Sequence, residues 1–323
     1  MPNPSQSPTD ILIVGAGPAG LACAIEATRA GLTHHILDQG TVADAIRRFP
    51  TELVFFSTPD LLEVGNVPFL TAGFRPTRIE VVRYYQRVSQ EHRLQISANN
   101  RVTAIEPGEQ GFRVITEHRT LEARNVVMAT GYFDSPNPFD VPGLDLSKVM
   151  RYYYEPFRYF KQRVAVVGGK NSAVEAALDL FRHGAEVTLI HRGETFSEGV
   201  KYWILPDIEN RIKAGEIRAL FGTRIGEIRE GSILVEGAVN AEIPNDFVFV
   251  MIGYRPETGL LKKAGVRLDP DSLAPVHDPK TMETNIRGLY VAGSLAAGKY
   301  NNKIFIENGR LHGQQIVSAL RQK

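Results

Sequence analysis

The sequence contains only one cysteine and almost no excess of either charge, and both shortages exclude classes of function. A single cysteine cannot form an internal disulfide, an internal dithiol redox pair or a cysteine-rich zinc site. The 37 basic and 36 acidic side chains leave a formal net charge of +1, so no surplus of cations is available to neutralise phosphates. We therefore expect no nucleic-acid partner. His34, His35 and His183 have no acidic residue at ligand spacing, so no metal site is expected either.

Long hydrophobic runs are also missing. The most apolar stretch, residues 11–25, is too short to cross a bilayer and contains Pro18 and three glycines. Residues 1–10 show no basic region followed by an apolar one, so no secretory signal is expected. At roughly 150 residues per domain, the length predicts about two domains. These observations predict a soluble, cytoplasmic protein without a membrane partner.

What the sequence does contain is an internal repeat. Residues 11–40 and 164–193 align without a gap. Each copy opens with four apolar residues, continues with glycines and a helical pattern that ends at Gly31 or Gly184, and closes with a second apolar stretch. This is the pattern of a βαβ unit, which folds into a parallel sheet.

The first copy carries a complete G-x-G-x-x-G fingerprint between a strand and a helix. In this motif Gly15 permits the tight turn, Gly17 lets a pyrophosphate approach the backbone, and Gly20 lets helix and strand pack closely. Asp38, at the end of the second strand, is placed to accept hydrogen bonds from ribose hydroxyls. We assign FAD to this copy.

The second copy differs at two informative positions. Lys170 replaces the middle glycine, and His191 followed by Arg192 stands where the first copy has Asp38. A carboxylate there would repel the 2′-phosphate of NADPH, whereas two potentially cationic groups would pair with it. We therefore assign NADPH to this copy; the alternative is a solvated strand end.

The remaining segments indicate how the two folds are joined. Turn-rich crossings at 135–143 and 251–256 bracket the second copy, and an apolar strand at 288–293 and a helix at 306–320 complete the first. The fold class predicted is α/β, with two Rossmann-like, three-layer dinucleotide-binding domains. The boundaries expected are 1–134 with 256–323 for a discontinuous FAD domain, and 135–255 for the NADPH domain inserted into it.

Several motifs carry a resemblance to a known group of flavoproteins. GAGPAG from Gly15, ATG from Ala129, VAVVGG from Val164, GYRP from Gly253 and VAG from Val291 resemble the low-molecular-weight thioredoxin reductase group in order and spacing. GGKNSA, PTELVFFST from Pro50 and KIFIENGRLHG from Lys303 look more specifically like the bacillithiol disulfide reductase family, which carries the same Lys-Asn-Ser-Ala run. The resemblance implies NADPH oxidation, FAD as relay and a disulfide or other thiol-derived acceptor.

The chain departs from these families at three places. Arg151 and Tyr154 stand where thioredoxin reductases carry a Cys-x-x-Cys pair, so no dithiol relay is expected. Ala19 stands where bacillithiol disulfide reductases typically have a cysteine, and Ser294 where the wider group has an aspartate. We therefore expect chemistry centred on the flavin.

Two side chains remain as catalytic candidates. The resemblance places Lys303 and the neighbouring Ile304 at the flavin edge, where Lys303 would stabilise the reduced anion; the alternative is a surface lysine before a helix. Cys23 lies about one helical turn beyond Ala19, but we expect it to be a buried core residue. The aromatic run at 152–160 either lines the flavin or packs as a linker, and packing is favoured.

The FAD contacts predicted are Gly15, Gly17, Pro18, Ala19, Gly20, Asp38, Gln39, Val102, Thr130, Gly131, Gly293, Ser294, Lys303 and Ile304. The NADPH contacts predicted are Gly168, Gly169, Lys170, Asn171, Ser172, Ala173, His191, Arg192, Lys201, Ile252 and Gly253.

The function predicted is NADPH-dependent reduction of a low-molecular-weight thiol disulfide through FAD. A ferredoxin- or flavodoxin-NADP reductase is the main alternative, because it needs no cysteine. A flavin monooxygenase and a non-catalytic nucleotide sensor are further alternatives. The partners expected are NADPH, a small-molecule disulfide or small redox protein, and further copies of the chain in a dimer or tetramer, the last by analogy with relatives.

Overall fold

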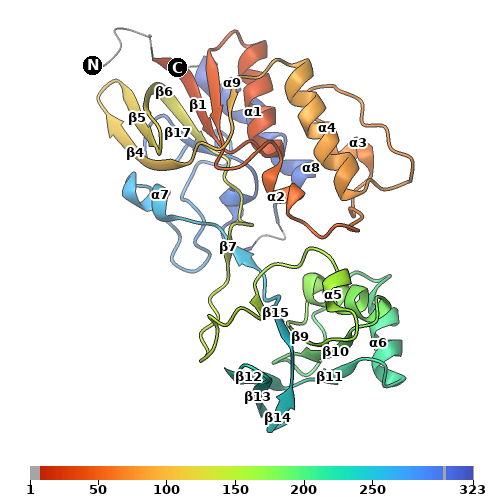
Figure 1. The fold of residues 1–323 in the computed structure, drawn as a ribbon. Coiled ribbons are helices and arrows are strands. Elements are labelled where there is room, and N and C mark those ends of the chain that lie inside the picture. Colours follow the sequence, from red (N-terminus) through yellow and green to blue (C-terminus); the bar gives the residue numbers. More distant parts are fainter. Residues whose placement is uncertain (1–7, 301–302, 323) are drawn as a thin grey trace. The chain divides into compact units, whose positions relative to one another are not determined.

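The computed structural model describes residues 8–300 and 303–322, which divide into two compact units (Figure 1). The first unit contains the described residues up to Ser135 and those from Tyr254 onwards. The second unit contains Pro136–Gly253. The sequence placed these boundaries at 134/135 and 255/256.

The first unit is built on a seven-stranded sheet in the order β3-β2-β1-β6-β5-β4, with β17 also paired to β6. The parallel strands are β1 (Thr9–Val14), β2 (His34–Leu37), β3 (Ile96–Ser97), β6 (Thr120–Met128) and β17 (Leu289–Val291). The hairpin β4 (Val102–Gly108) and β5 (Gly111–Thr116) extends the sheet in antiparallel fashion. The last four residues of β1 are all buried, as expected for a parallel strand covered on both faces.

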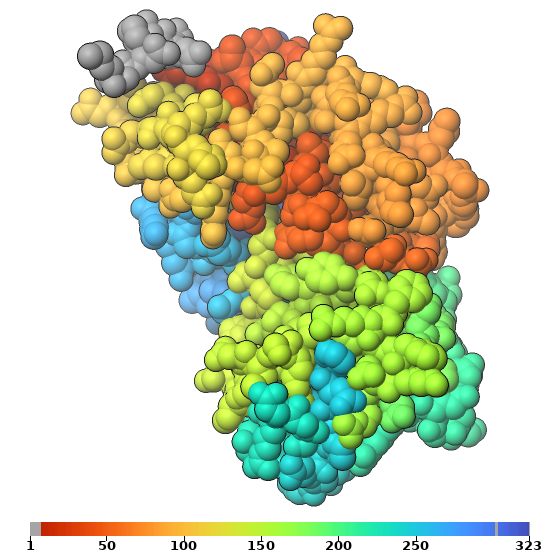
Figure 2. All heavy atoms as spheres, viewed as in Figure 1, coloured from red at the N-terminus to blue at the C-terminus, as the bar shows by residue number. Residues whose placement is uncertain are grey.

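Helices of this unit pack against the sheet and one another. They are α1 (Pro18–Arg29), α2 (Asp44–Arg47), α3 (Pro59–Leu62), α4 (Arg78–Glu91), α7 (Gly259–Lys263), α8 (Ile306–Gly309) and α9 (His312–Arg321), with a 3₁₀ turn η2 at Gly293–Ala297. A capping box between Thr77 and Glu80 begins α4, which lies on the molecular surface seen in Figure 2.

Helices α1 and α9 lie unusually close together. A Cβ on Gly313 of α9 would lie 2.9 Å from the backbone of Ala22 and Cys23 in α1, so only glycine allows this approach. The helical stretch that the sequence predicted at 306–320 is observed as two helices, α8 and α9, with residues 310–311 between them. The break brings Gly309 against Gly293, where a Cβ on Gly309 would lie 3.2 Å from the Gly293 Cα.

The second unit contains a five-stranded parallel sheet in the order β11-β10-β9-β15-β8. Its strands are β8 (Val149–Met150), β9 (Arg163–Val167), β10 (Glu186–Ile190), β11 (Arg218–Leu220) and β15 (Phe247–Val250). The helices α5 (Asn171–Arg182) and α6 (Leu205–Lys213) accompany it. A separate antiparallel sheet contains β12 (Thr223–Ile228), β13 (Ser232–Gly237) and β14 (Ala241–Pro244). The short strands β7 (Ser135–Pro136) and β16 (Tyr254–Arg255) pair at the two chain crossings.

The two repeat copies have the same strand register. Ile11 pairs with His34 in the first unit, and Val164 pairs with Val187 in the second, so both partners are shifted by the same number of residues. Two βαβ units with identical register are what the gapless repeat predicted, and the α/β fold with two Rossmann-like units is confirmed.

The aromatic run at 152–160 packs into the second unit. Tyr153 is buried, its hydroxyl donates to Asp179 at 2.5 Å, and its ring meets Phe249 edge to face at 5.2 Å. Burial, followed by the hydrogen bond to Asp179, raises the pKa of Tyr153. Tyr159 in the 3₁₀ turn η1 (Phe157–Tyr159) is also buried and meets Phe249 edge to face. Tyr153 and Tyr159 therefore pack within this unit, whereas Tyr154, Phe157 and Phe160 of the same run are exposed.

Candidate functional site

The fingerprint turn of the first unit is shaped by its three glycines. A Cβ on Gly15, whose φ is +116°, would lie 2.4 Å from the Ala129 carbonyl oxygen. A Cβ on Gly20 would lie 1.9 Å from the Gly15 carbonyl oxygen, whereas a Cβ on Gly17 would meet no atom within 4 Å. The turn is therefore packed tightly on its protein side and open at Gly17, which is the shape that a pyrophosphate against a helix N-terminus requires.

Asp38 links the turn after β1 to the turn after β2. Its Oδ2 accepts the Ala16 N–H at 2.6 Å, and its Oδ1 accepts the Gly40 N–H at 2.7 Å. Burial raises the pKa of Asp38, and the two backbone donors oppose that shift. Each carboxylate oxygen keeps a further lone pair for a ribose hydroxyl.

A cavity of about 620 Å³ opens beside this turn and contains most of the residues predicted to bind FAD. The predicted residues that line it are Gly15, Gly17, Pro18, Ala19, Asp38, Gln39, Val102, Thr130, Gly131, Gly293, Ser294 and Ile304. Gly20 is not among the lining residues, because it packs beneath Gly15. Lys303 is also absent from the lining; its ammonium lies 5.0 Å from the centre of the Tyr300 ring.

Sequence reasoning missed a polar and aromatic part of the wall. Arg48 forms ion pairs with Asp44, at 2.8 Å, and with Asp134, and its guanidinium lies 5.3 Å from the centre of the Phe133 ring. Further lining residues that it missed are Phe49, Phe55, Phe56, Ser57, Leu62, Ile306, Glu307 and Arg310. The segments PTELVFFST and KIFIENGRLHG contain most of these residues, so the family likeness of those segments was the available signal.

A partly buried histidine, His312, contacts the C-terminal part of the cavity wall. Gly293 has φ +68°, and its N–H donates to Nδ1 of His312 at 3.1 Å. Burial, followed by the charge of His277, lowers the pKa of His312 to about 4. His312 is therefore neutral at pH 7, which is the state in which Nδ1 can accept that hydrogen bond.

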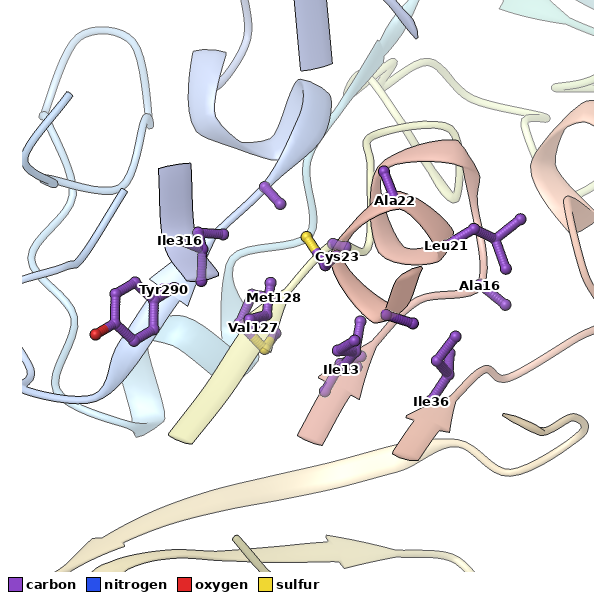
Figure 3. Packing of buried hydrophobic residues seen from close by; sticks show 14 of the residues in the cluster. Ile13, Ala16, Leu21, Ala22, Cys23, Ile36, Val127, Met128, Tyr290 and Ile316 are labelled. Carbon is purple, nitrogen blue, oxygen red and sulfur yellow. The ribbon is translucent and has the colours of Figure 1, made fainter. Parts of the chain in front are cut away.

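The lone thiol lies inside the core. Cys23 is 1% exposed and belongs to the first unit's hydrophobic cluster, where its side chain lies on the side of α1 towards Ile316 and Met128 (Figure 3). Burial, followed by the charge of Glu26, raises the pKa of Cys23 to about 12. The thiolate needed to attack a disulfide is therefore scarce, and Cys23 does not line the cavity. Its predicted core position is observed.

The second unit has a fingerprint turn that is occupied by its own histidine. A Cβ on Gly169 would lie 2.4 Å from atoms of the His191 ring, and a Cβ on Gly193 would lie 2.7 Å from its Nε2. Burial, followed by the charge of Arg192, lowers the pKa of His191. The imidazole is therefore mainly uncharged at neutral pH and acts as packing for the turn. Lys170 and Arg192 remain as exposed cations at this end of the sheet.

Two other predicted NADPH residues hold a loop against α5. The Asn171 side chain donates to the Gly199 carbonyl at 2.9 Å and accepts the Lys201 N–H at 2.8 Å. Lys201 forms an ion pair with Glu175. Ser172 is exposed, Gly168 and Ala173 are buried in the turn, and Ile252 and Gly253 follow β15.

The fold and these turns define a class of protein. The family model for pyridine nucleotide-disulphide oxidoreductases matches residues 12–293, and the chain belongs to this family. It is therefore an oxidoreductase whose cofactors are FAD and NADPH. In the first unit the open Gly17, the free lone pairs of Asp38 and the adjoining cavity fit a flavin dinucleotide.

Particular relatives narrow the comparison, and the resemblance to the bacillithiol disulfide reductase family is confirmed. The chain is 39% identical to bacilliredoxin reductase Bdr of Bacillus subtilis (strain 168), over 97% of each chain. It is similar to the solved structure of bacillithiol disulfide reductase Bdr (YpdA) from Staphylococcus aureus, with 37% identity, a TM-score of 0.95 and coverage of 98% and 99% of the two chains. It is also 26% identical to a ferredoxin–NADP reductase of Ignicoccus hospitalis, over 97% of this chain and 98% of that one.

Among the described residues, no helix has the length and hydropathy to span a membrane, and no group of histidine, cysteine and acidic side chains is arranged to hold a metal ion.

The His312 hydrogen bond predicts acid sensitivity. Because the folded-state pKa, about 4, lies below the roughly 6.5 of an unfolded histidine, the unfolded chain takes up the proton first as pH falls. The contribution of neutral His312 to the free energy of unfolding is complete above pH 6.5. It is lost as pH falls from 6.5 towards 4, by on the order of 2 kcal/mol. In thermal melts between pH 7 and 4, His312→Asn, which keeps an acceptor but does not titrate, should lose less Tm than wild type. Equal losses would contradict this account.

Replacing Cys23 with alanine should leave turnover within about twofold of wild type. The expected physical cost is a small core cavity, on the order of 1 kcal/mol in urea unfolding. Stopped-flow absorbance should show flavin reduction by NADPH and reoxidation by acceptor both preserved. If the variant's flavin is still reduced by NADPH but is no longer reoxidised by the acceptor, the Cys23 thiol takes part in electron transfer.

Proposed function

We propose that this chain is an FAD-containing, NADPH-dependent reductase of a low-molecular-weight thiol disulfide of the bacillithiol disulfide type. The observation that carries the proposal is the whole-length similarity, at 37% identity, to a solved structure named bacillithiol disulfide reductase. The 39% identical relative is named a bacilliredoxin reductase. A cofactor-sized cavity beside an open fingerprint turn is consistent with it.

The proposal gives each unit one nucleotide. Residues 1–134 and 256–323 form the FAD domain, in which the backbone at Gly17 meets the pyrophosphate and Asp38 holds the ribose. Residues 135–255 form the NADPH domain, in which Lys170 and Arg192 pair with the 2′-phosphate and the His191 ring packs against the turn at Gly169. The sequence assignments of Asn171 and Lys201 are retained as contributions to the shape of this site.

When bound, FAD supplies the relay for two electrons from NADPH to the acceptor. The protein contributes binding and orientation and has no dithiol of its own, because Arg151 and Tyr154 stand where thioredoxin reductases carry their cysteines. Arg48 remains charged between Asp44 and Asp134 and fixes that part of the wall. Ala19 presents a methyl group to the cavity where bacillithiol disulfide reductases typically have a thiol.

The proposal also includes a cytoplasmic location and a homo-oligomer, a dimer or a tetramer. Both follow by analogy with relatives. Cell fractionation and size-exclusion chromatography with light scattering test them.

A second candidate is a ferredoxin- or flavodoxin-NADP reductase. The relative in Ignicoccus hospitalis and the inert Cys23 favour it, because such an enzyme needs no protein thiol. Its partner would be a small redox protein rather than a small disulfide.

One anaerobic experiment separates these functions. The flavin of the purified holoenzyme is first reduced with NADPH. Bacillithiol disulfide, oxidised ferredoxin and oxygen are then added in separate experiments. We expect bacillithiol disulfide to restore the oxidised flavin spectrum at least tenfold faster than the other two. Rapid reoxidation by ferredoxin alone would establish the second candidate instead.

Replacing Arg192 with alanine should raise KM for NADPH about tenfold while changing KM for NADH less than twofold. The reason is that only NADPH carries the phosphate with which the guanidinium pairs. Arg218→Ala, at another exposed arginine of the same unit, is the matched control and should change neither constant. Equal effects of Arg192→Ala on both nucleotides would refute the assignment of this site.

A further inference from the structure

The carboxylates of the first unit's cavity are not equivalent. The acidic side chains that line it are Asp38, Asp44, Asp134, Glu257 and Glu307. Asp44 and Asp134 are neutralised by Arg48, and Asp38 accepts two backbone N–H groups. Glu257 is exposed to solvent. Glu307 is partly buried and forms no ion pair with any cation in the described ranges.

Glu307 is nevertheless held in place. Its Oε1 accepts a hydrogen bond from the hydroxyl of Ser57, a residue 250 positions away that is only 7% exposed. Arg310 follows in the same segment, but its Nη1 donates to the main-chain carbonyls of Asp60, at 3.0 Å, and Glu63. The neighbouring guanidinium therefore donates to carbonyl oxygens and forms no ion pair with the Glu307 carboxylate.

Two aromatic rings belong to the same part of the wall. Phe56 precedes Ser57 in sequence, Phe305 lies two residues before Glu307, and both rings line the cavity while remaining 58% and 57% exposed. Aromatic faces attract cations. The ring of Phe56 makes such a cation–π contact within the protein, since the Arg75 guanidinium lies 5.3 Å from its centre.

An oriented carboxylate without a cation, together with cation-attracting rings at the edge of a cavity, is suited to an ammonium group. We propose that Glu307, positioned by Ser57 and flanked by Phe305, binds a protonated amine of the disulfide substrate. This inference rests on the proposed disulfide reductase activity and narrows its substrate class to disulfides that carry an amine near the sulfur atoms. The subsite selects the substrate and takes no part in bond breaking.

Two commercial disulfides of nearly equal size test this directly. Cystamine carries an ammonium group at each end, and bis(2-hydroxyethyl) disulfide carries hydroxyls at the same positions. With wild-type holoenzyme we expect kcat/KM to favour cystamine about fivefold or more, mainly through KM. Glu307→Gln keeps the shape and removes the charge, and should reduce the preference to less than twofold. Glu257→Gln, the matched control at the exposed carboxylate, should retain it.

A binding measurement makes the test independent of turnover. Cystamine binding to the oxidised holoenzyme is followed by calorimetry, with FAD content and Tm recorded for each variant. Wild type and Glu257→Gln should bind cystamine about fivefold more tightly than the hydroxyl analogue, and Glu307→Gln should not. The wild-type preference should also weaken between 20 mM and 500 mM salt, because a partly exposed ion pair is screened. A salt-independent preference would overturn the proposal, whatever the stability of the variants.

Ser57 acts through Glu307 and is tested separately. Ser57→Ala should lower the preference for cystamine, and Ser57→Thr, which restores a hydroxyl, should recover it. Loss in both variants would reject the positioning role.

The remaining outcomes are distinct. If wild type reduces neither these two disulfides nor bacillithiol disulfide yet binds cystamine selectively through Glu307, the proposed reductase function fails and the amine subsite stands. If wild type treats both disulfides alike in turnover and binding, or if Glu307→Gln keeps the wild-type preference, the subsite is rejected and the reductase function is unaffected.

Discussion

The contact between the Gly15 carbonyl and Gly20 is the constraint on which the first unit depends. It presses α1 against the end of β1 so closely that a Cβ on Gly20 would lie 1.9 Å from that oxygen. The same closeness points the start of α1 at the cavity and brings the Ala16 N–H to the Asp38 carboxylate. Nucleotide binding and helix packing are therefore set by one steric condition, and neither can be altered without the other.

The two halves of the repeat use this condition differently. In the first unit the space above the turn is open at Gly17, whereas in the second unit the ring of His191 fills the space above Gly169. The two copies also differ at the middle glycine of the fingerprint, where the second copy has Lys170 in place of Gly17.

The sequence could predict what depends on local spacing, and it failed where the outcome depends on distant contacts. The glycine spacing and apolar runs predicted both βαβ units, and the crossings lie within two residues of the structural boundaries. The close approach of Gly309 to Gly293 is one such contact. Likewise, the Ser57–Glu307 bond joins segments 250 residues apart, and no local pattern encodes such a pairing.

The split of the first unit along the chain has a consequence for biosynthesis. Strand β17 pairs with β6, and α9 packs on α1, yet both later elements emerge from the ribosome only after the entire second unit. Since domains generally fold during synthesis, the second unit can mature while β1 and α1 still wait for their partners. The nascent chain thus passes through a stage in which one half is folded and the other exposes apolar surface, which is when chaperones and proteases would find it.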